Sequence, residues 1–147
     1  MKLIITLLLI CIIAHAEAQD EQRVRSQQIG AHIGLTTGMG ISYRFWPAKL
    51  GIQATFIPVK TDTIQFISFG LTGLLTLSEK QHFKTFLYLG NHLVSRNGHQ
   101  EYNIGFGPGF TVGSKVRFNL MIGYGFYDVS DTFNMLPTGE IGVYYKF

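Results

Sequence analysis

The most constraining feature of this 147-residue chain is a regular alternation of large apolar residues with small or polar ones. Because successive side chains of a β-strand point to opposite faces, a period of two residues indicates strands. From Gln28 onward no stretch keeps the spacing of a helix, so the sequence predicts an all-β protein. The alternation is clearest where one set of positions holds Tyr102, Ile104, Phe106, Pro108, Phe110 and Val112, and the intervening set holds Asn103, Gly105, Gly107, Gly109 and Thr111.

Eight segments carry this pattern, and turn-forming residues separate them. The fifth segment alternates least well. We expect strands over residues 28–35, 39–46, 51–57, 64–77, 83–93, 102–112, 116–127 and 140–147. The connections at one end, residues 47–49, 78–82 and 113–115, are short, whereas three of the four at the other end, residues 36–38, 58–63, 95–101 and 128–136, are longer and more polar. Such asymmetry is typical of outer-membrane barrels.

The two faces of these strands differ in a way that decides the class of barrel. One face is bulky and apolar, and the other is small, polar and rich in glycine. The interior of an eight-stranded barrel is only just wide enough for side chains, so the bulky face must point outward. An apolar outer face is stable only against lipid, and closure removes the sheet edges that lipid cannot hydrate. We therefore predict a closed up-and-down antiparallel transmembrane β-barrel of eight strands.

The first 18 residues have the features of a secretory signal peptide. Lys2 precedes the apolar run Leu3–Ile13, and the overlapping small-residue sites 14–16 and 16–18 follow it. An apolar run of about 11 residues is too short for a membrane-spanning helix, which needs roughly 20. We expect cleavage after Ala18, a flexible lead over residues 19–27, and a barrel domain over residues 28–147.

Cysteine content and charge exclude several classes of function. The one cysteine, Cys11, lies within the expected signal peptide, so the mature chain has no disulfide, thiolate nucleophile or cysteine metal site. Removing Lys2 and Glu17 leaves the net charge at +3. The basic residues are scattered, without the clustered stripe that nucleic-acid binding uses. A weak attraction to anionic lipid headgroups remains open, although net charge alone is not specific.

The last residues of the chain resemble the C-terminal insertion signal of outer-membrane barrels. Ile141, Val143, Tyr145 and Phe147 form an alternating apolar strand that ends in an aromatic residue. With the signal peptide and seven preceding strands, residues 28–147 are similar to the small eight-stranded outer-membrane β-barrel proteins of Gram-negative bacteria. The resemblance implies insertion by the barrel-assembly machinery and a location in the bacterial outer membrane. It identifies no subfamily.

Several charged residues fall on the face expected to line the interior. They are His32, Arg44, Lys84, Arg117 and Glu140. One interpretation is that they pair and plug a narrow lumen, because unpaired buried charges are costly. The other is a polar conduit or binding cavity. A pairing of Glu140 with Arg44 or Arg117 is the corresponding hypothesis.

The best candidates for catalysis lie around the expected connection at residues 95–101. They are His92, Ser95, His99 and Glu101. His92 and Ser95 are three residues apart, so an extended strand points them to opposite faces. A solvated polar loop explains these residues more simply. We expect no enzymatic activity.

The connection at residues 128–136 contains three side chains with carboxylate or amide oxygen atoms that could bind a cation. Asp128, Asp131 and Asn134 lack the full calcium-loop pattern, so we expect neither a metal site nor a cofactor. Aromatic residues near the ends of two strands suit an interfacial girdle of a membrane barrel. They are Tyr43, Phe45, Trp46, Tyr144 and Tyr145.

The expected function is a structural or interaction role through the outer loops, without a wide pore. The expected partners are outer-membrane lipid and a protein or lipopolysaccharide at those loops, with no nucleic acid. The first alternative is a narrow conduit, or a barrel that binds lipid or a small apolar ligand. The further alternatives are a lipid A-modifying hydrolase or acyltransferase and a soluble exported barrel.

Overall fold

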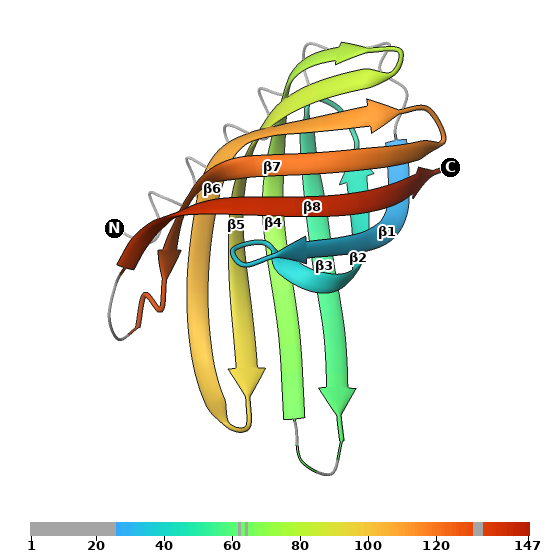
Figure 1. The fold of residues 1–147 in the computed structure, drawn as a ribbon. Coiled ribbons are helices and arrows are strands. Elements are labelled where there is room, and N and C mark those ends of the chain that lie inside the picture. Colours follow the sequence, from blue (N-terminus) through green and yellow to red (C-terminus); the bar gives the residue numbers. More distant parts are fainter. Residues whose placement is uncertain (1–25, 62, 64, 131–133) are drawn as a thin grey trace, which may run out of the picture.

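The computed structural model describes residues 26–61, 63, 65–130 and 134–147, which form one closed antiparallel barrel (Figure 1). The eight strands, in chain order around the barrel, confirm the predicted fold class. They are β1 (Ser26–Gly34), β2 (Gly38–Trp46), β3 (Leu50–Lys60), β4 (Gln65–Lys80), β5 (Phe83–Arg96), β6 (His99–Gly113), β7 (Val116–Tyr127) and β8 (Asn134–Lys146). The expected signal peptide and its cleavage site lie outside the described residues. Within the described residues, no helix is long and apolar enough to cross a membrane.

Closure comes from the pairing of the first strand with the last. Ile29 lies opposite Tyr145, and Ile33 lies opposite Ile141. This register brings the start of β1 and the end of β8 to one end of the barrel, together with the β2–β3, β4–β5 and β6–β7 turns. We call this end the terminal rim and the opposite end the loop rim.

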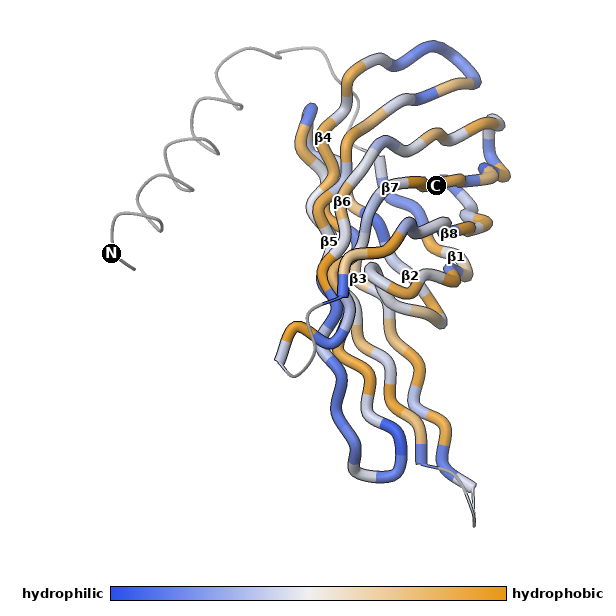
Figure 2. The backbone as a smooth tube through the Cα atoms, turned by 60° about the vertical axis from the view of Figure 1, so that its left-hand side comes forward, coloured by the Kyte–Doolittle hydropathy of each residue, from blue (hydrophilic) through white to orange (hydrophobic). Residues whose placement is uncertain are grey.

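The bulky apolar face points outward, as predicted. Leu89 and Phe118 are each 63% exposed, whereas the inward-facing Ser42 and Thr55 are completely buried. Figure 2 shows the resulting alternation of apolar and polar positions along the strands. The barrel therefore presents hydrocarbon to its surroundings and keeps its polar side chains inside.

Part of the interior is more aromatic than the sequence reasoning anticipated. The buried apolar residues are Trp46, Leu74, Phe86, Tyr88, Met121 and Tyr144. The girdle hypothesis is therefore wrong for Trp46 and Tyr144, whereas Tyr43 and Tyr145 do face outward. The physical reason is strand parity: Trp46 falls in phase with inward-facing Arg44, and Tyr144 falls in phase with inward-facing Glu140.

Strands extend into three of the predicted outer loops. Pairing continues at Val59–Phe66 in the β3–β4 hairpin and at Arg96–His99 in the β5–β6 hairpin. Strand β8 begins at Asn134, within the predicted connection 128–136. The polar composition of these segments did not predict where the strands end, because main-chain pairing can continue between residues whose side chains are solvated. Figure 1 shows both hairpins projecting from the loop rim.

Candidate functional site: a plugged lumen

The turn between β1 and β2 folds into the lumen. Strands β1 and β2 have 9 residues each, whereas β4, β5 and β6 have 16, 14 and 15. Their shorter hairpin ends partway along the barrel (Figure 1), and Thr36 and Thr37 are completely buried. We call residues 36–38 the plug turn. The prediction that these residues form an outer loop is wrong because this hairpin is too short to reach the loop rim.

Four inward-facing glycines, on β4 to β7, provide the space for the plug turn. A Cβ atom on Gly90 would lie 2.5 Å from Thr37 Cγ2, and one on Gly125 would lie 2.6 Å from Thr36 Cγ2. A Cβ atom on Gly70 would collide with the carbonyl group of Thr37, and one on Gly105 with the Thr36 side chain. Only glycine leaves room for the turn at these positions.

Glu140 anchors the plug turn from β8. Its carboxylate accepts a hydrogen bond from the Thr36 N–H at 3.0 Å, and also from the hydroxyl groups of Thr36 and Thr37. His32 Nε2 lies 2.7 Å from Thr37 Oγ1 and 3.5 Å from Glu140 Oε2. These partners compensate the cost of burying a carboxylate.

The hypothesis that Glu140 pairs with Arg44 or Arg117 is wrong. Glu140 forms no ion pair with either of them, and both arginines have other partners. The plug turn occupies the position beside the carboxylate that the arginine was expected to take. Strand parity placed the charges inside, but it did not show that a turn would enter from the loop rim.

His92 holds the opposite side of the plug turn. Its Nδ1 lies 2.8 Å from the Leu35 carbonyl oxygen, which can only accept, so Nδ1 carries the proton. In the neutral ring, Nε2 then accepts from the Ser68 hydroxyl at 2.7 Å. Ser68 Oγ in turn accepts the Met39 N–H at 3.0 Å, and Asn103 Nδ2 donates to the same Leu35 carbonyl at 3.1 Å. Both ends of the turn are thus tied to β4, β5 and β6.

A second layer, centred on Arg44, lies on the terminal side of the plug turn. The guanidinium group is completely buried; Nε donates to Gln53 Oε1 at 2.7 Å and Nη1 donates to Asn119 Oδ1 at 3.0 Å. Its central carbon lies 3.9 Å from the centre of the Tyr144 ring. Arginine suits this position because its planar cation can donate in several directions and stack on an aromatic face.

A third layer fills the lumen near the terminal rim. Lys84 Nζ lies 3.1 Å from Glu79 Oε2 and 4.1 Å from the centre of the Trp46 ring. Trp46 meets Phe86 edge-on, with ring centres 5.7 Å apart. Arg117 Nε donates to the Ser114 carbonyl at 3.1 Å. The arrangement as a whole holds the barrel wall together around a filled interior.

The structure does not bring the four candidate catalytic residues together, although His99 Nε2 lies 3.9 Å from Glu101 Oε1. His92 is buried in the lumen, Ser95 lies on β5, and His99 and Glu101 are exposed near the tip of the β5–β6 hairpin. Sequence reasoning missed the Ser68–His92 contact, for which the signal is a shared inward parity on paired strands. Both residues are completely buried, and the third group is a carbonyl oxygen. Their evident role is to fix the plug turn.

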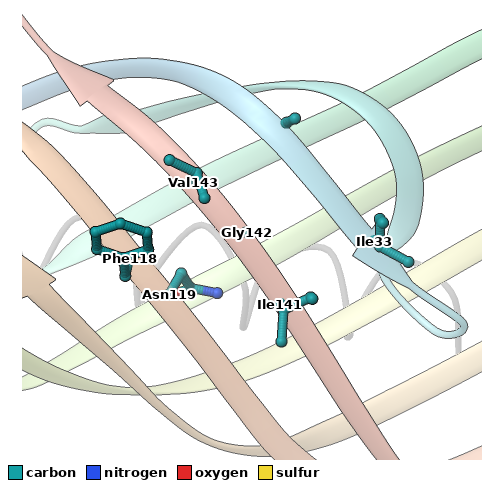
Figure 3. Close-up of a pocket in the computed structure, with 7 residues that line it drawn as sticks. Ile33, Phe118, Asn119, Ile141, Gly142 and Val143 are labelled. Atoms are coloured by element: carbon teal, nitrogen blue, oxygen red, sulfur yellow. The ribbon is translucent and has the colours of Figure 1, made fainter.

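The remaining predicted sites are on the surface or outside the described residues. Asp131 lies outside the described residues, which contain no group of three or more His, Cys, Asp or Glu side chains able to hold a metal ion. The C-terminal residues Ile141, Val143, Tyr145 and Phe147 all face outward. A hollow of about 340 Å³ lies on this wall, where Figure 3 shows side chains of β7, β8 and β1 around Gly142. The role of these residues as an insertion signal stays a prediction.

Comparison with known proteins supports the fold. No family model and no curated protein matches the chain. The N-terminal β-barrel domain of Pseudomonas aeruginosa OprF is similar, with a TM-score of 0.53 and 9% identity over 84% of this chain and 96% of that one. Yersinia pestis Ail, an outer membrane protein solved in a phospholipid bilayer nanodisc, gives a TM-score of 0.45 and 11% identity over 84% and 98%. The likeness to the OprF domain, together with the eight-stranded closed sheet, shows that the chain has the fold of a small outer-membrane barrel.

Proposed function

We propose that this protein is an integral outer-membrane barrel with a closed lumen, and that it has a structural or interaction role through its projecting hairpins. The plug turn is the observation that carries this proposal. Thr36 and Thr37 fill the lumen and donate hydrogen bonds to Glu140 of β8, and the preceding Leu35 carbonyl accepts a hydrogen bond from His92 of β5. A barrel closed in this way is suited to displaying its rims and its wall, and not to transport or catalysis.

The outer wall supports the membrane location. Large exposed apolar side chains occur on all eight strands, including Ile33, Ile52, Leu89 and Phe118. Soluble monomers rarely expose contiguous apolar patches above a few hundred Å². In a bilayer these side chains contact lipid instead of water, so their exposure costs no free energy. The closed sheet also leaves no unpaired strand edge in the lipid.

The two hairpins at the loop rim support the interaction role. The Asn97 N–H donates to the Gln65 carbonyl at 2.8 Å, and the Gln65 N–H donates to Asn97 Oδ1 at 2.9 Å. These bonds join the β3–β4 and β5–β6 hairpins side by side into a four-stranded platform. Figure 2 shows that the β5–β6 tip is hydrophilic. Such a surface suits contact with a protein or with the lipopolysaccharide headgroup.

Cysteine labelling in intact cells tests the location and the orientation. Because the expected mature chain has no cysteine, His99→Cys and Ser114→Cys each introduce one thiol, at the loop rim and at the terminal rim. We expect a membrane-impermeant maleimide to label His99→Cys in intact cells, and to label Ser114→Cys only after the outer membrane is permeabilised. Labelling of Ser114→Cys alone in intact cells would reverse the proposed orientation.

A narrow conduit is the second candidate, favoured by the polar residues that line the lumen. It would require the plug turn to leave its site. Recording in planar bilayers separates the two functions. We expect no stepwise conductance from the wild-type barrel, and reproducible channel openings would favour the conduit.

A further inference from the structure

A groove crosses the outer wall of β3, β4 and β5 where one outward position has no side chain. Gly73 of β4 lies between its register partners, Ile52 of β3 and Leu89 of β5. The next outward row toward the terminal rim is Leu50, Leu75 and Leu87. Together with Pro47, these residues line a hollow of about 600 Å³ that is almost entirely apolar.

The glycine at this position is not required by its surroundings. A Cβ atom on Gly73 would meet only the Leu89 carbonyl oxygen, at 3.8 Å, which is an ordinary contact. By contrast, a Cβ atom on Gly70, an inward position of the same strand, would collide with the plug turn. The missing side chain at Gly73 therefore forms the groove and serves no packing need that the structure shows.

Two lysines lie on the terminal side of the groove, Lys49 next to its lining residues and Lys80 further out at the end of β4. Lys49 lies in the β2–β3 turn between Pro47 and Leu50, and its carbonyl accepts the Thr76 N–H at 2.8 Å. Lys80 ends β4 on the outward face, because the preceding residue, Glu79, turns inward to pair with Lys84. Neither Lys49 nor Lys80 forms an ion pair with another described residue.

The charge of the whole terminal rim has the same sign. Among the described residues near this rim, Glu79 is the one acidic side chain, and the basic ones are Lys49, Lys80, Lys84, Lys115, Arg117 and Lys146. Among the described residues of the loop rim, the basic Lys60 and Arg96 are balanced by the acidic Glu101 and Asp128. The excess of positive charge therefore lies at the end where the groove opens.

We propose that this groove binds one anionic phospholipid. An acyl chain lies along Gly73 between Ile52 and Leu89, and the phosphate group lies against Lys49, between the lining residues Pro47 and Leu50. Burial of hydrocarbon and attraction to basic side chains at a membrane surface both favour this ligand. No basic residue lines either this groove or the hollow around Gly142 (Figure 3), but Lys49 lies between two residues that line the groove, Pro47 and Leu50. The cysteine labelling expected under the proposed function puts the terminal rim on the periplasmic side, and on that basis the bound phospholipid belongs to the inner leaflet of the outer membrane.

Native mass spectrometry of the folded barrel in detergent tests the site, with phosphatidylglycerol and phosphatidylcholine of identical chains as probes. We expect one phosphatidylglycerol to stay bound, and phosphatidylcholine to bind at least fivefold more weakly. Lys49→Gln should weaken phosphatidylglycerol binding about fivefold, which corresponds to one lysine near a membrane surface. The matched control, Lys60→Gln at the loop rim, should leave it unchanged.

Filling the groove tests the acyl-chain position. Gly73→Leu should abolish retention of phosphatidylglycerol, whereas Gly139→Leu, at an outward glycine of β8 with open space around it, should not. Gly73→Val is the second variant if Gly73→Leu does not fold. Equal retention by the Gly73 and Gly139 variants, or equal binding of the two lipids, would overturn the proposal. These measurements do not depend on the orientation of the barrel in the cell. They can therefore contradict the lipid site without contradicting the proposed function, which the cysteine labelling tests.

Discussion

At the scale of single residues, Glu140 and the inward glycines determine how the lumen is closed. Glu140 supplies the acceptors for the plug turn, and Gly70, Gly90, Gly105 and Gly125 supply the space. The two contributions are physically different. The carboxylate satisfies buried donors, whereas the glycines remove atoms that would collide with the turn. Separate substitutions can therefore test them.

Glu140→Gln should destabilise the barrel. The amide of glutamine keeps one acceptor oxygen, but its NH₂ group replaces the oxygen that faces the Thr37 hydroxyl and His32. Because NH₂ is a donor, the buried Thr37 hydroxyl loses its acceptor. We expect a loss of about 1–3 kcal/mol in the free energy of unfolding. Urea unfolding in detergent micelles measures it, with Glu101→Gln at an exposed position as the control. An unchanged unfolding midpoint for Glu140→Gln would contradict this account of the anchor.

Gly70→Ala should destabilise the barrel much more than Gly73→Ala. Both glycines lie on β4, but the added methyl group points into the plug turn at Gly70 and into the open groove at Gly73. Overpacking at Gly70 should cost about 1–3 kcal/mol. The same urea unfolding experiment compares the two variants. Equal stabilities would mean that the turn does not occupy the lumen in solution.

At the scale of elements, the tip of the β5–β6 hairpin is distinct from the closed part of the barrel. The first residues of β6, near His99, pair with β5, whereas pairing of β6 with β7 starts only at Ile104. The tip therefore contributes to the platform at the loop rim and adds little to barrel closure. The β1–β2 hairpin differs because its turn is part of the interior.

Excision of residues 95–100 should leave the barrel folded. Val94 and Glu101 lie opposite each other, so an Asn-Gly turn can join them in a two-residue connection. The loss of the two Asn97–Gln65 hydrogen bonds should cost about 0.5–1.5 kcal/mol each at most. Heat-modifiable migration on a gel reports folding. The comparison variant, Thr36→Gly with Thr37→Gly, should be destabilised more, and the reverse order would contradict the assigned roles of the two hairpins.

At the scale of the whole molecule, the orientation of the faces makes lipid the solvent of the outer wall. The polar residues that a soluble barrel would expose are inside, and they hydrogen-bond to one another in layers. A membrane barrel and a soluble barrel therefore respond in opposite ways to a charge on this wall.

Leu89→Arg should be costly in a bilayer. Leu89 is 63% exposed, so in a water-soluble barrel the change would fall within about 0.5 kcal/mol. On the lipid face near the bilayer midplane it should cost about 2–4 kcal/mol. Urea unfolding from phosphatidylcholine vesicles measures the difference, with His99→Arg at the hairpin tip as the control. A neutral effect of Leu89→Arg would favour the soluble exported barrel.

Strand parity made much of this fold predictable. It is a local property, so alternation such as that around Phe106 and Phe118 showed the face that each side chain occupies. The turn-forming residues between the alternating segments showed the number of strands. The same parity indicates that Arg44, Glu140 and Trp46 point inward. The pairing of consecutive strands is also predictable from the sequence, because β-strands joined by short turns become neighbours in the sheet. The strand ends at residues 60, 96 and 134 were missed because polar composition does not end a ladder of main-chain hydrogen bonds.

The sequence by itself determined an eight-stranded barrel with an apolar wall and a polar interior, because a two-residue period and a narrow lumen allow no other arrangement of these faces. Only the tertiary structure decided what closes the lumen. Thr36 meets Glu140 across 104 residues of chain, and the contact depends on the length of the β1–β2 hairpin relative to its longer neighbours. That relation between distant strands is not contained in any local pattern.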